Sequence, residues 1–289
     1  MAEIKVLGHK LFYRDLNQSD TILVFLHGIP VDGSLWDGVI QELGPQFRSI
    51  VPDFLGFGKS EKPLDIDYSL ENYTLMLDQL VEDLDLSRLF LVGMDLGLMV
   101  GLNYWTRHPE KICGLILMEG IVVDIDIALH SQSIANRLLM SLMKIELFAR
   151  NAFVEQGEKS AGKMIKAGTI RKVESVNDYS KAFADKELCE RVLLHGVCAH
   201  TLSNHQKTRE PADSVKRYYK ALCDSELPKL FFYAKPGSTM SGKLVRRLRS
   251  DFRNSRWVCA GPGKHFLPFD APQTIAHAIQ DFVEEYGRK

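Results

Sequence analysis

A run of apolar residues broken by a single glycine, Leu89 to Met94, is the feature that most constrains the fold. The run has the length of a strand and lacks polar alternation, which is typical of a strand buried on both faces of a parallel sheet. It continues through Gly93-Met94-Asp95-Leu96-Gly97 into Leu98 to Trp105, a segment with helical spacing. A sharp turn between strand and helix needs neighbours without a Cβ, so the two glycines predict that Asp95 projects from a tight turn.

Strand patterns recur on both sides of this run. They cover residues 4–15 (a pair of strands around Gly8), 21–26, 47–52, 112–119, 229–234 and 255–260. Helical spacing is found at residues 35–43, 70–84 and 272–286. Strands that alternate with helices predict an α/β fold with a doubly wound, mostly parallel sheet covered on both faces.

The alternation stops in the middle of the chain. From residue 125 to residue 227 the pattern is helical, richer in Lys and Glu, and without a convincing buried strand. We therefore expect a core domain made of residues 1–123 and 228–289, with an inserted helical cap at residues 124–227. Ligands of such sheets bind at the carboxyl ends of the strands, where the cap would sit.

The charge balance excludes several classes of partner. The 289 residues contain 36 Lys and Arg against 37 Asp and Glu, a formal net charge of −1, so neither nucleic acid nor an anionic membrane is expected as a partner. No stretch reaches the roughly 18 apolar residues that cross a bilayer, and the first residues lack the pattern of a secretory leader. We expect a cytoplasmic protein that does not bind membranes.

Three side chains that can carry chemistry follow predicted strands: Asp95, Glu119 and His265. Together they could act as nucleophile, acid and base, with Glu119 orienting His265. A carboxylate in the nucleophile position can displace a leaving group from an sp³ carbon, and the resulting alkyl ester is then hydrolysed. The backbone N–H groups of Ile29 and Leu96 would form the oxyanion hole for that hydrolysis. The simpler alternatives are a helix-capping Asp95 and a solvent-exposed Glu119 at a strand end.

Motifs along nearly the whole chain resemble those of α/β-hydrolase fold enzymes of the haloalkane dehalogenase family. They are His27-Gly28-x-Pro30, Asp53-x-x-Gly56-x-Gly58-x-Ser60, Asp95, Arg107-His108-Pro109-Glu110, Met118-Glu119, Pro228-Lys229-Leu230-Phe231 and His265-Phe266. The resemblance implies an enzyme with an Asp-Glu-His triad and a covalent ester on Asp95. It also implies that Phe153, in a cap segment similar to one that borders the family's pocket, lies beside the substrate. His27 is expected to organise the oxyanion turn.

Two positions depart from the family pattern. The side chains that usually hold a departing halide, an Asn before Pro and a Trp after the nucleophile, correspond here to Ile29 and Leu96, which cannot donate hydrogen bonds. Losing one such donor could cost about 3–4 kcal/mol by analogy with an oxyanion hole, so ordinary halide release should be impaired. The predicted pocket, lined by Ile29, Leu96 and Phe153, suits a small apolar organic substrate and water, with no metal or cofactor.

Other functions remain open at this point. Epoxide hydrolases share the Asp turn and protonate the epoxide oxygen with cap tyrosines, for which Tyr179, Tyr218 and Tyr219 are candidates. A repurposed biosynthetic α/β-hydrolase would use the same pocket for different chemistry. A non-catalytic small-molecule binding protein is the alternative from another class.

Overall fold

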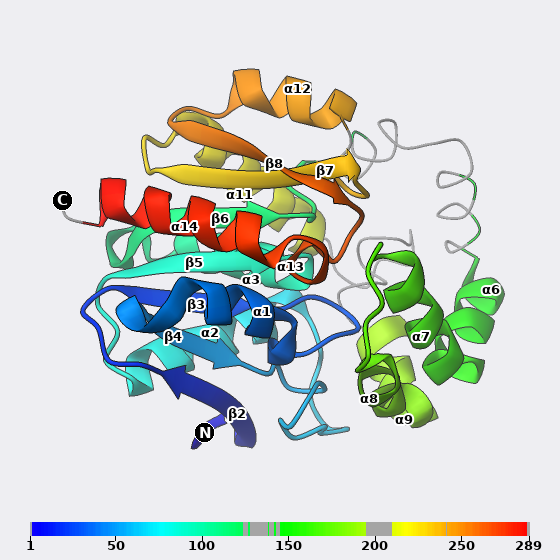
Figure 1. Ribbon diagram of the computed structural model, residues 1–289. Coiled ribbons are helices and arrows are strands. Elements are labelled where there is room, and N and C mark those ends of the chain that lie inside the picture. Colours follow the sequence, from blue (N-terminus) through cyan, green and yellow to red (C-terminus); the bar gives the residue numbers. More distant parts are fainter. Residues whose placement is uncertain are drawn as a thin grey trace.

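An eight-stranded sheet forms the centre of the molecule, in the order β1-β2-β4-β3-β5-β6-β7-β8 (Figure 1). The computed structural model describes residues 2–123, 127, 138, 142, 145–194, 210–240 and 242–287. The strands are β1 (Ala2–Val6), β2 (His9–Leu16), β3 (Ile22–Leu26), β4 (Arg48–Pro52), β5 (Leu89–Met94), β6 (Ile112–Met118), β7 (Lys229–Pro236) and β8 (Ser255–Gly263). Only the pairs that involve β2 are antiparallel, so the predicted α/β class with a mostly parallel sheet is confirmed.

Helices cover both faces of the sheet, in two separate apolar clusters. The core helices are α1 (Asp37–Leu43), α2 (Leu70–Asp83), α3 (Leu96–Trp105), α12 (Gly242–Asp251), α13 (Leu267–Asp270) and α14 (Pro272–Tyr286). Residues of α1, α13 and α14 belong to one cluster, and those of α2, α3 and α12 to the other. Along β5, Leu89 and Leu91 enter one cluster while Phe90 and Val92 enter the other, which explains why this strand is apolar throughout.

Helices and helical turns are the only regular elements in the described part of the segment between β6 and β7. They are α6 (Glu146–Arg150), η4 (Asn151–Glu155), α7 (Gly157–Ala167), α8 (Val176–Lys181), η5 (Ala182–Ala184), α9 (Lys186–Cys189), η6 (Glu190–Leu194) and α11 (Glu210–Asp224). Figure 1 shows α6 to α9 grouped beside the sheet, whereas α11 lies with the core helices and contacts α3. The exact division at residues 124 and 227 remains a prediction.

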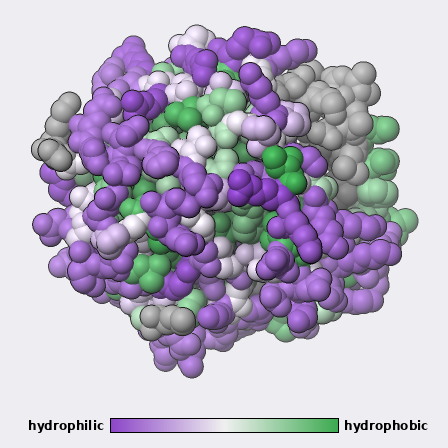
Figure 2. All heavy atoms as spheres, in the orientation of Figure 1, coloured by the Kyte–Doolittle hydropathy of each residue, from purple (hydrophilic) through white to green (hydrophobic). Residues whose placement is uncertain are grey.

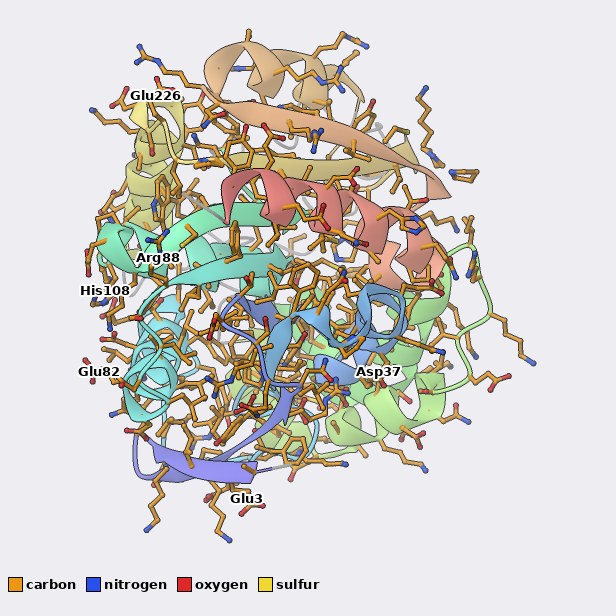
Figure 3. All side chains as sticks on the ribbon, turned by 60° about the vertical axis from the view of Figure 1, so that its left-hand side comes forward. Glu3, Asp37, Glu82, Arg88, His108 and Glu226 are labelled. Carbon is orange, nitrogen blue, oxygen red and sulfur yellow. The ribbon has the colours of Figure 1, made fainter. Side chains whose placement is uncertain are left out.

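The two ends of the parallel strands differ in character. Figure 3 shows Glu82, Arg88 and His108 along one side of the molecule, where α2 ends, β5 begins and α3 has ended. Helices α6 to α9 stand at the opposite edge, toward which the parallel strands run (Figure 1).

Hydrophilic residues cover most of the molecular face that is shown in Figure 2. Within the described ranges no helix has the length and apolarity to cross a membrane.

Candidate active site

The turn between β5 and α3 holds Asp95 in a left-handed backbone conformation, with φ 53°. Its flanking glycines are required by space. A Cβ on Gly97 would lie 2.2 Å from the carbonyl oxygen of Leu26, and one on Gly93 would lie 2.8 Å from the Cα of Leu98. The glycines therefore let strand and helix approach each other, while Asp95 itself adopts the unusual backbone angle.

The two carboxylate oxygens of Asp95 have different partners. Oδ1 accepts a hydrogen bond from the backbone N–H of Ile29 at 3.0 Å, and the backbone N–H of Leu96 also donates to the carboxylate. Oδ2 lies 3.4 Å from Nε2 of His265. The Asp95 side chain is 32% exposed, and Gly28 packs so closely that a Cβ there would lie 2.5 Å from the Cβ of Asp95. Oδ1 is thus held by the backbone N–H of Ile29, and Oδ2 faces the imidazole.

Glu119 follows β6 and lies on the other side of His265. Its Oε2 is 4.0 Å from Nδ1 of His265, which is too long for a hydrogen bond. That oxygen instead accepts the backbone N–H groups of Ser238, Thr239 and Met240 at 3.2, 2.7 and 3.3 Å. Oε1 of Glu119 and Nδ1 of His265 are buried and have no hydrogen-bond partner among the described residues. The structure brings the three predicted side chains together, with a gap between the acid and the imidazole.

Burial and mutual charge set the protonation of this cluster. Burial raises the pKa of Glu119 to about 7, against the opposing effects of His265 and the three backbone donors. Burial also acts to raise the pKa of Asp95, but His265 and the backbone N–H groups outweigh it, so that pKa lies below its ordinary value. For His265, burial acts to lower the pKa, and Asp95 and then Glu119 reverse this and raise it. The Asp95 carboxylate and the His265 imidazolium therefore stabilise each other.

His27 supports the turn that carries Ile29. Its Nδ1 lies 2.9 Å from the carbonyl oxygen of Gly28, and its Nε2 accepts the backbone N–H of Phe54 at 2.9 Å. Only the tautomer protonated at Nδ1 satisfies both contacts. Burial lowers the pKa of His27, in agreement with a neutral ring that fixes the backbone.

The residues expected in the pocket are apolar and mostly buried. Ile29 is 6% exposed and Leu96 is 2% exposed, and Phe153 on η4 is half-buried against the same apolar cluster. The histidines of the cap at positions 195, 200 and 205 lie outside the described residues. Within the described ranges, no group of three or more His, Cys, Asp or Glu could hold a metal ion.

The three candidate tyrosines each use the hydroxyl elsewhere. Tyr218 donates to the carbonyl oxygen of Ile121 at 2.7 Å, and Tyr219 donates to Oδ2 of Asp251 at 2.8 Å. The Tyr179 hydroxyl pairs with the hydroxyl of Ser34 at 2.6 Å. Burial raises the pKa of all three phenols. None of these contacts is directed at Asp95.

Comparison with known proteins places the chain in a family. The model of the alpha/beta hydrolase fold family matches residues 21–272. The chain belongs to the α/β-hydrolase fold family. Similar relatives include a haloalkane dehalogenase of Mesorhizobium japonicum, 25% identical over 98% of this chain and 91% of its own length, and one of Sphingobium indicum, 29% identical over 97% and 94%. Among solved structures, the ancestral haloalkane dehalogenase AncHLD2 is 25% identical, with a TM-score of 0.90 and 100% coverage of both chains. The expected resemblance to haloalkane dehalogenases is confirmed.

The sequence did not reveal how this α/β-hydrolase anchors the loop that carries His265. The backbone N–H groups of His265 and Phe266 both donate to the carbonyl oxygen of Gly168, just after α7, at 2.8 Å. Asp270 is 4% exposed and accepts the backbone N–H of Lys264 at 3.1 Å through Oδ2. Its Oδ1 accepts the Thr169 hydroxyl and the N–H groups of residues 170 and 171. His265 is therefore tied to the segment that follows α7, by contacts that no sequence motif indicates.

Proposed function

We propose that this α/β-hydrolase opens small alkyl electrophiles by forming a covalent ester on Asp95, which His265-activated water then hydrolyses. The observation that carries the proposal is that the two carboxylate oxygens of Asp95 have different partners. Oδ1 is held by the backbone N–H of Ile29, whereas Oδ2 faces His265 and is available to attack. A carboxylate that only capped α3 would have no need of the imidazole, and Asp95 makes no side-chain capping hydrogen bond in that helix.

In the first step, Oδ2 of Asp95 attacks an sp³ carbon, and the leaving group departs with the electron pair from the far side. The lowered pKa of Asp95 keeps the carboxylate ionised for this attack. Its 32% exposure leaves room for a substrate carbon to approach. The product is a neutral alkyl ester.

In the second step, His265 takes a proton from water, and the water oxygen attacks Cγ of Asp95. Negative charge then develops on Oδ1, which already accepts the backbone N–H of Ile29, while the backbone N–H of Leu96 also donates to this carboxyl group. Esterification removes the Asp95 charge that raises the pKa of His265, and burial then favours the neutral imidazole. His265 is thus neutral when it has to accept a proton from water. Glu119 stabilises the imidazolium across 4.0 Å.

Several observations support a small alkyl electrophile as the substrate. The relatives named haloalkane dehalogenases support a small organic substrate with water as co-reactant. Epoxide opening is less favoured, because the hydroxyls of Tyr218 and Tyr219 are engaged with Ile121 and Asp251. A pure binding protein would need neither the imidazole nor the oriented backbone donors beside Asp95.

Trapping the ester tests the proposal. The His265→Ala variant should be alkylated by a substrate and then stall, because the hydrolytic base is missing. The adduct should appear on the tryptic peptide from Leu89 to Arg107, which contains Asp95. The Asp95→Asn variant, nearly identical in shape, is the control and should acquire no adduct. His265→Gln preserves more of the volume and repeats the test if the alanine variant does not fold.

An isotope experiment tests the second step. In a single turnover in water enriched in the heavy oxygen isotope, the label should enter the Asp95 peptide, because water attacks Cγ and the alcohol keeps the original carboxylate oxygen. Label found only in the alcohol would mean direct attack of water on the substrate, and the covalent mechanism would be wrong.

A further inference from the structure

Among the described residues, the two side chains that flank the attacking carboxylate, Ile29 and Leu96, cannot donate a hydrogen bond to an anionic leaving group. Ile29 and Leu96 flank Asp95 through their backbone N–H groups, and their own side chains are apolar and almost fully buried. His265 lies 3.4 Å from Oδ2, beside the attacking oxygen. An in-line displacement sends the leaving group away from that oxygen, toward the far side of the carbon.

The charge of the site is negative or neutral. Asp95 and Glu119 contribute two carboxyl groups, and His265 is the one cationic group that pairs with either of them among the described residues. Their other partners are backbone N–H groups. The Asp95 carboxylate and the His265 imidazolium balance each other, and Glu119 adds a negative charge when it ionises, so the site does not repel a cation.

From this geometry, and given the covalent role proposed for Asp95, we infer that the enzyme accepts cationic alkyl donors whose leaving group departs neutral, of the sulfonium class. Oδ2 of Asp95 forms the new C–O bond, and the C–S bond breaks with its electron pair going to sulfur. A neutral thioether leaves and a neutral alkyl ester remains. Water then hydrolyses the ester, so that a sulfonium and water give an alcohol, a thioether and a proton.

Low polarity favours this reaction. Attack of a carboxylate on a sulfonium carbon converts two opposite charges into two neutral groups, so the transition state carries less charge than the reactants. An apolar environment at Ile29 and Leu96 solvates the separated charges poorly and leaves the neutral products unaffected. The absence of donors on these two side chains, which hinders halide loss, is therefore no hindrance here.

The test compares three probes with the same alkyl chain: butyldimethylsulfonium, chlorobutane and epoxybutane. Each is incubated with the His265→Ala variant, and alkylation of the Asp95 peptide is followed by mass spectrometry, with Asp95→Asn as the blank. Alkylation by the sulfonium is expected to be about tenfold or more faster than by chlorobutane. One thioether should be released for each ester formed on Asp95. It is dimethyl sulfide if the butyl carbon is attacked and butyl methyl sulfide if a methyl carbon is attacked. The His265→Gln variant serves if the alanine variant does not fold.

The outcomes separate this inference from the proposed function. Alkylation by chlorobutane or epoxybutane, with none or slower alkylation by the sulfonium, would leave the covalent role of Asp95 intact and overturn the cationic substrate. No adduct from any probe would overturn both. A further variant sharpens the result: Ile29→Asn adds a side-chain donor in a smaller side chain. The preference for sulfonium over chlorobutane should then fall by about tenfold or more, and an unchanged preference would contradict the reasoning.

Discussion

Replacing Glu119 with Gln should make the protein more stable at neutral and alkaline pH. The Glu119 side chain is fully buried, and burial raises its pKa from 4.5 to about 7. A carboxyl group whose pKa is raised in the folded state contributes its full stability below about pH 4.5 and loses it as the pH rises through about 7. The gap corresponds to about 3 kcal/mol of unfolding free energy. Gln cannot ionise, so the variant should escape this loss.

The hydrogen bonds around Glu119 provide a matched control. A Gln oxygen can still accept the N–H groups of Ser238, Thr239 and Met240, whereas Glu119→Ala leaves them without that acceptor. An unsatisfied buried donor costs about 1–3 kcal/mol. The Ala variant should therefore be destabilised at every pH, and the Gln variant should be equal to or more stable than the original protein above about pH 7.

Urea unfolding of the three proteins between about pH 4.5 and about pH 8 measures the effect. Asp95 and then Glu119 also raise the pKa of His265. The stability that the His265 imidazolium contributes is likewise lost as the pH rises above the pKa of His265 in the folded protein. The free energy of unfolding of the Glu119→Gln variant, minus that of the original protein, should grow by about 3 kcal/mol across this pH range. Parallel curves for the two proteins would refute the idea that a buried ionisable Glu119 opposes folding at neutral pH.

Three further changes test individual contacts. Gly28→Ala should lower kcat/KM by about 100-fold or more, because its Cβ would lie 2.5 Å from that of Asp95; steady-state kinetics checks this, and a normal rate would mean the turn can yield. Tyr218→Phe and Tyr219→Phe should cost about 1 kcal/mol in urea unfolding and leave hydrolysis unchanged; a large loss of epoxide opening would restore the tyrosines as proton donors. Asp270→Asn should lower kcat more than it changes KM, since an amide cannot accept at both ends from Lys264 and from residues 169–171; an unaltered kcat would show that this anchor does not position His265.

Most of the sheet could be predicted because its buried strands are short apolar runs, a pattern that can be recognised without knowledge of distant contacts. The strand from Leu89 to Met94 is buried on both faces, and its apolar sequence, broken only by Gly93, indicated this directly. Helix α12 was missed although Leu244, Val245 and Leu248 are its buried residues and have helical spacing. Five charged side chains and one Ser among its ten residues hide a narrow apolar stripe.

The contacts of the site were harder to predict than its residues. Asp95, Glu119 and His265 could be selected because each follows a strand, and parallel strands bring their carboxyl ends to one edge. The donors to Glu119 come from the backbone of residues 238–240, and backbone N–H groups leave no trace in side-chain identity. The gap of 4.0 Å between Glu119 and His265 depends on packing finer than any motif.

Five neighbouring strands each contribute one part of the proposed site. In the order β3, β5, β6, β7 and β8 these parts are the N–H of Ile29, Asp95, Glu119, the N–H groups of residues 238–240, and His265. Asp95 and Glu119 follow paired strands and have φ of 53° and 41°, a conformation that costs roughly 1–2 kcal/mol for residues other than Gly. Glycine at either position would relieve that cost and remove a carboxyl group. Backbone strain at these two carboxyl-bearing residues therefore points to a role for both side chains that folding alone does not require.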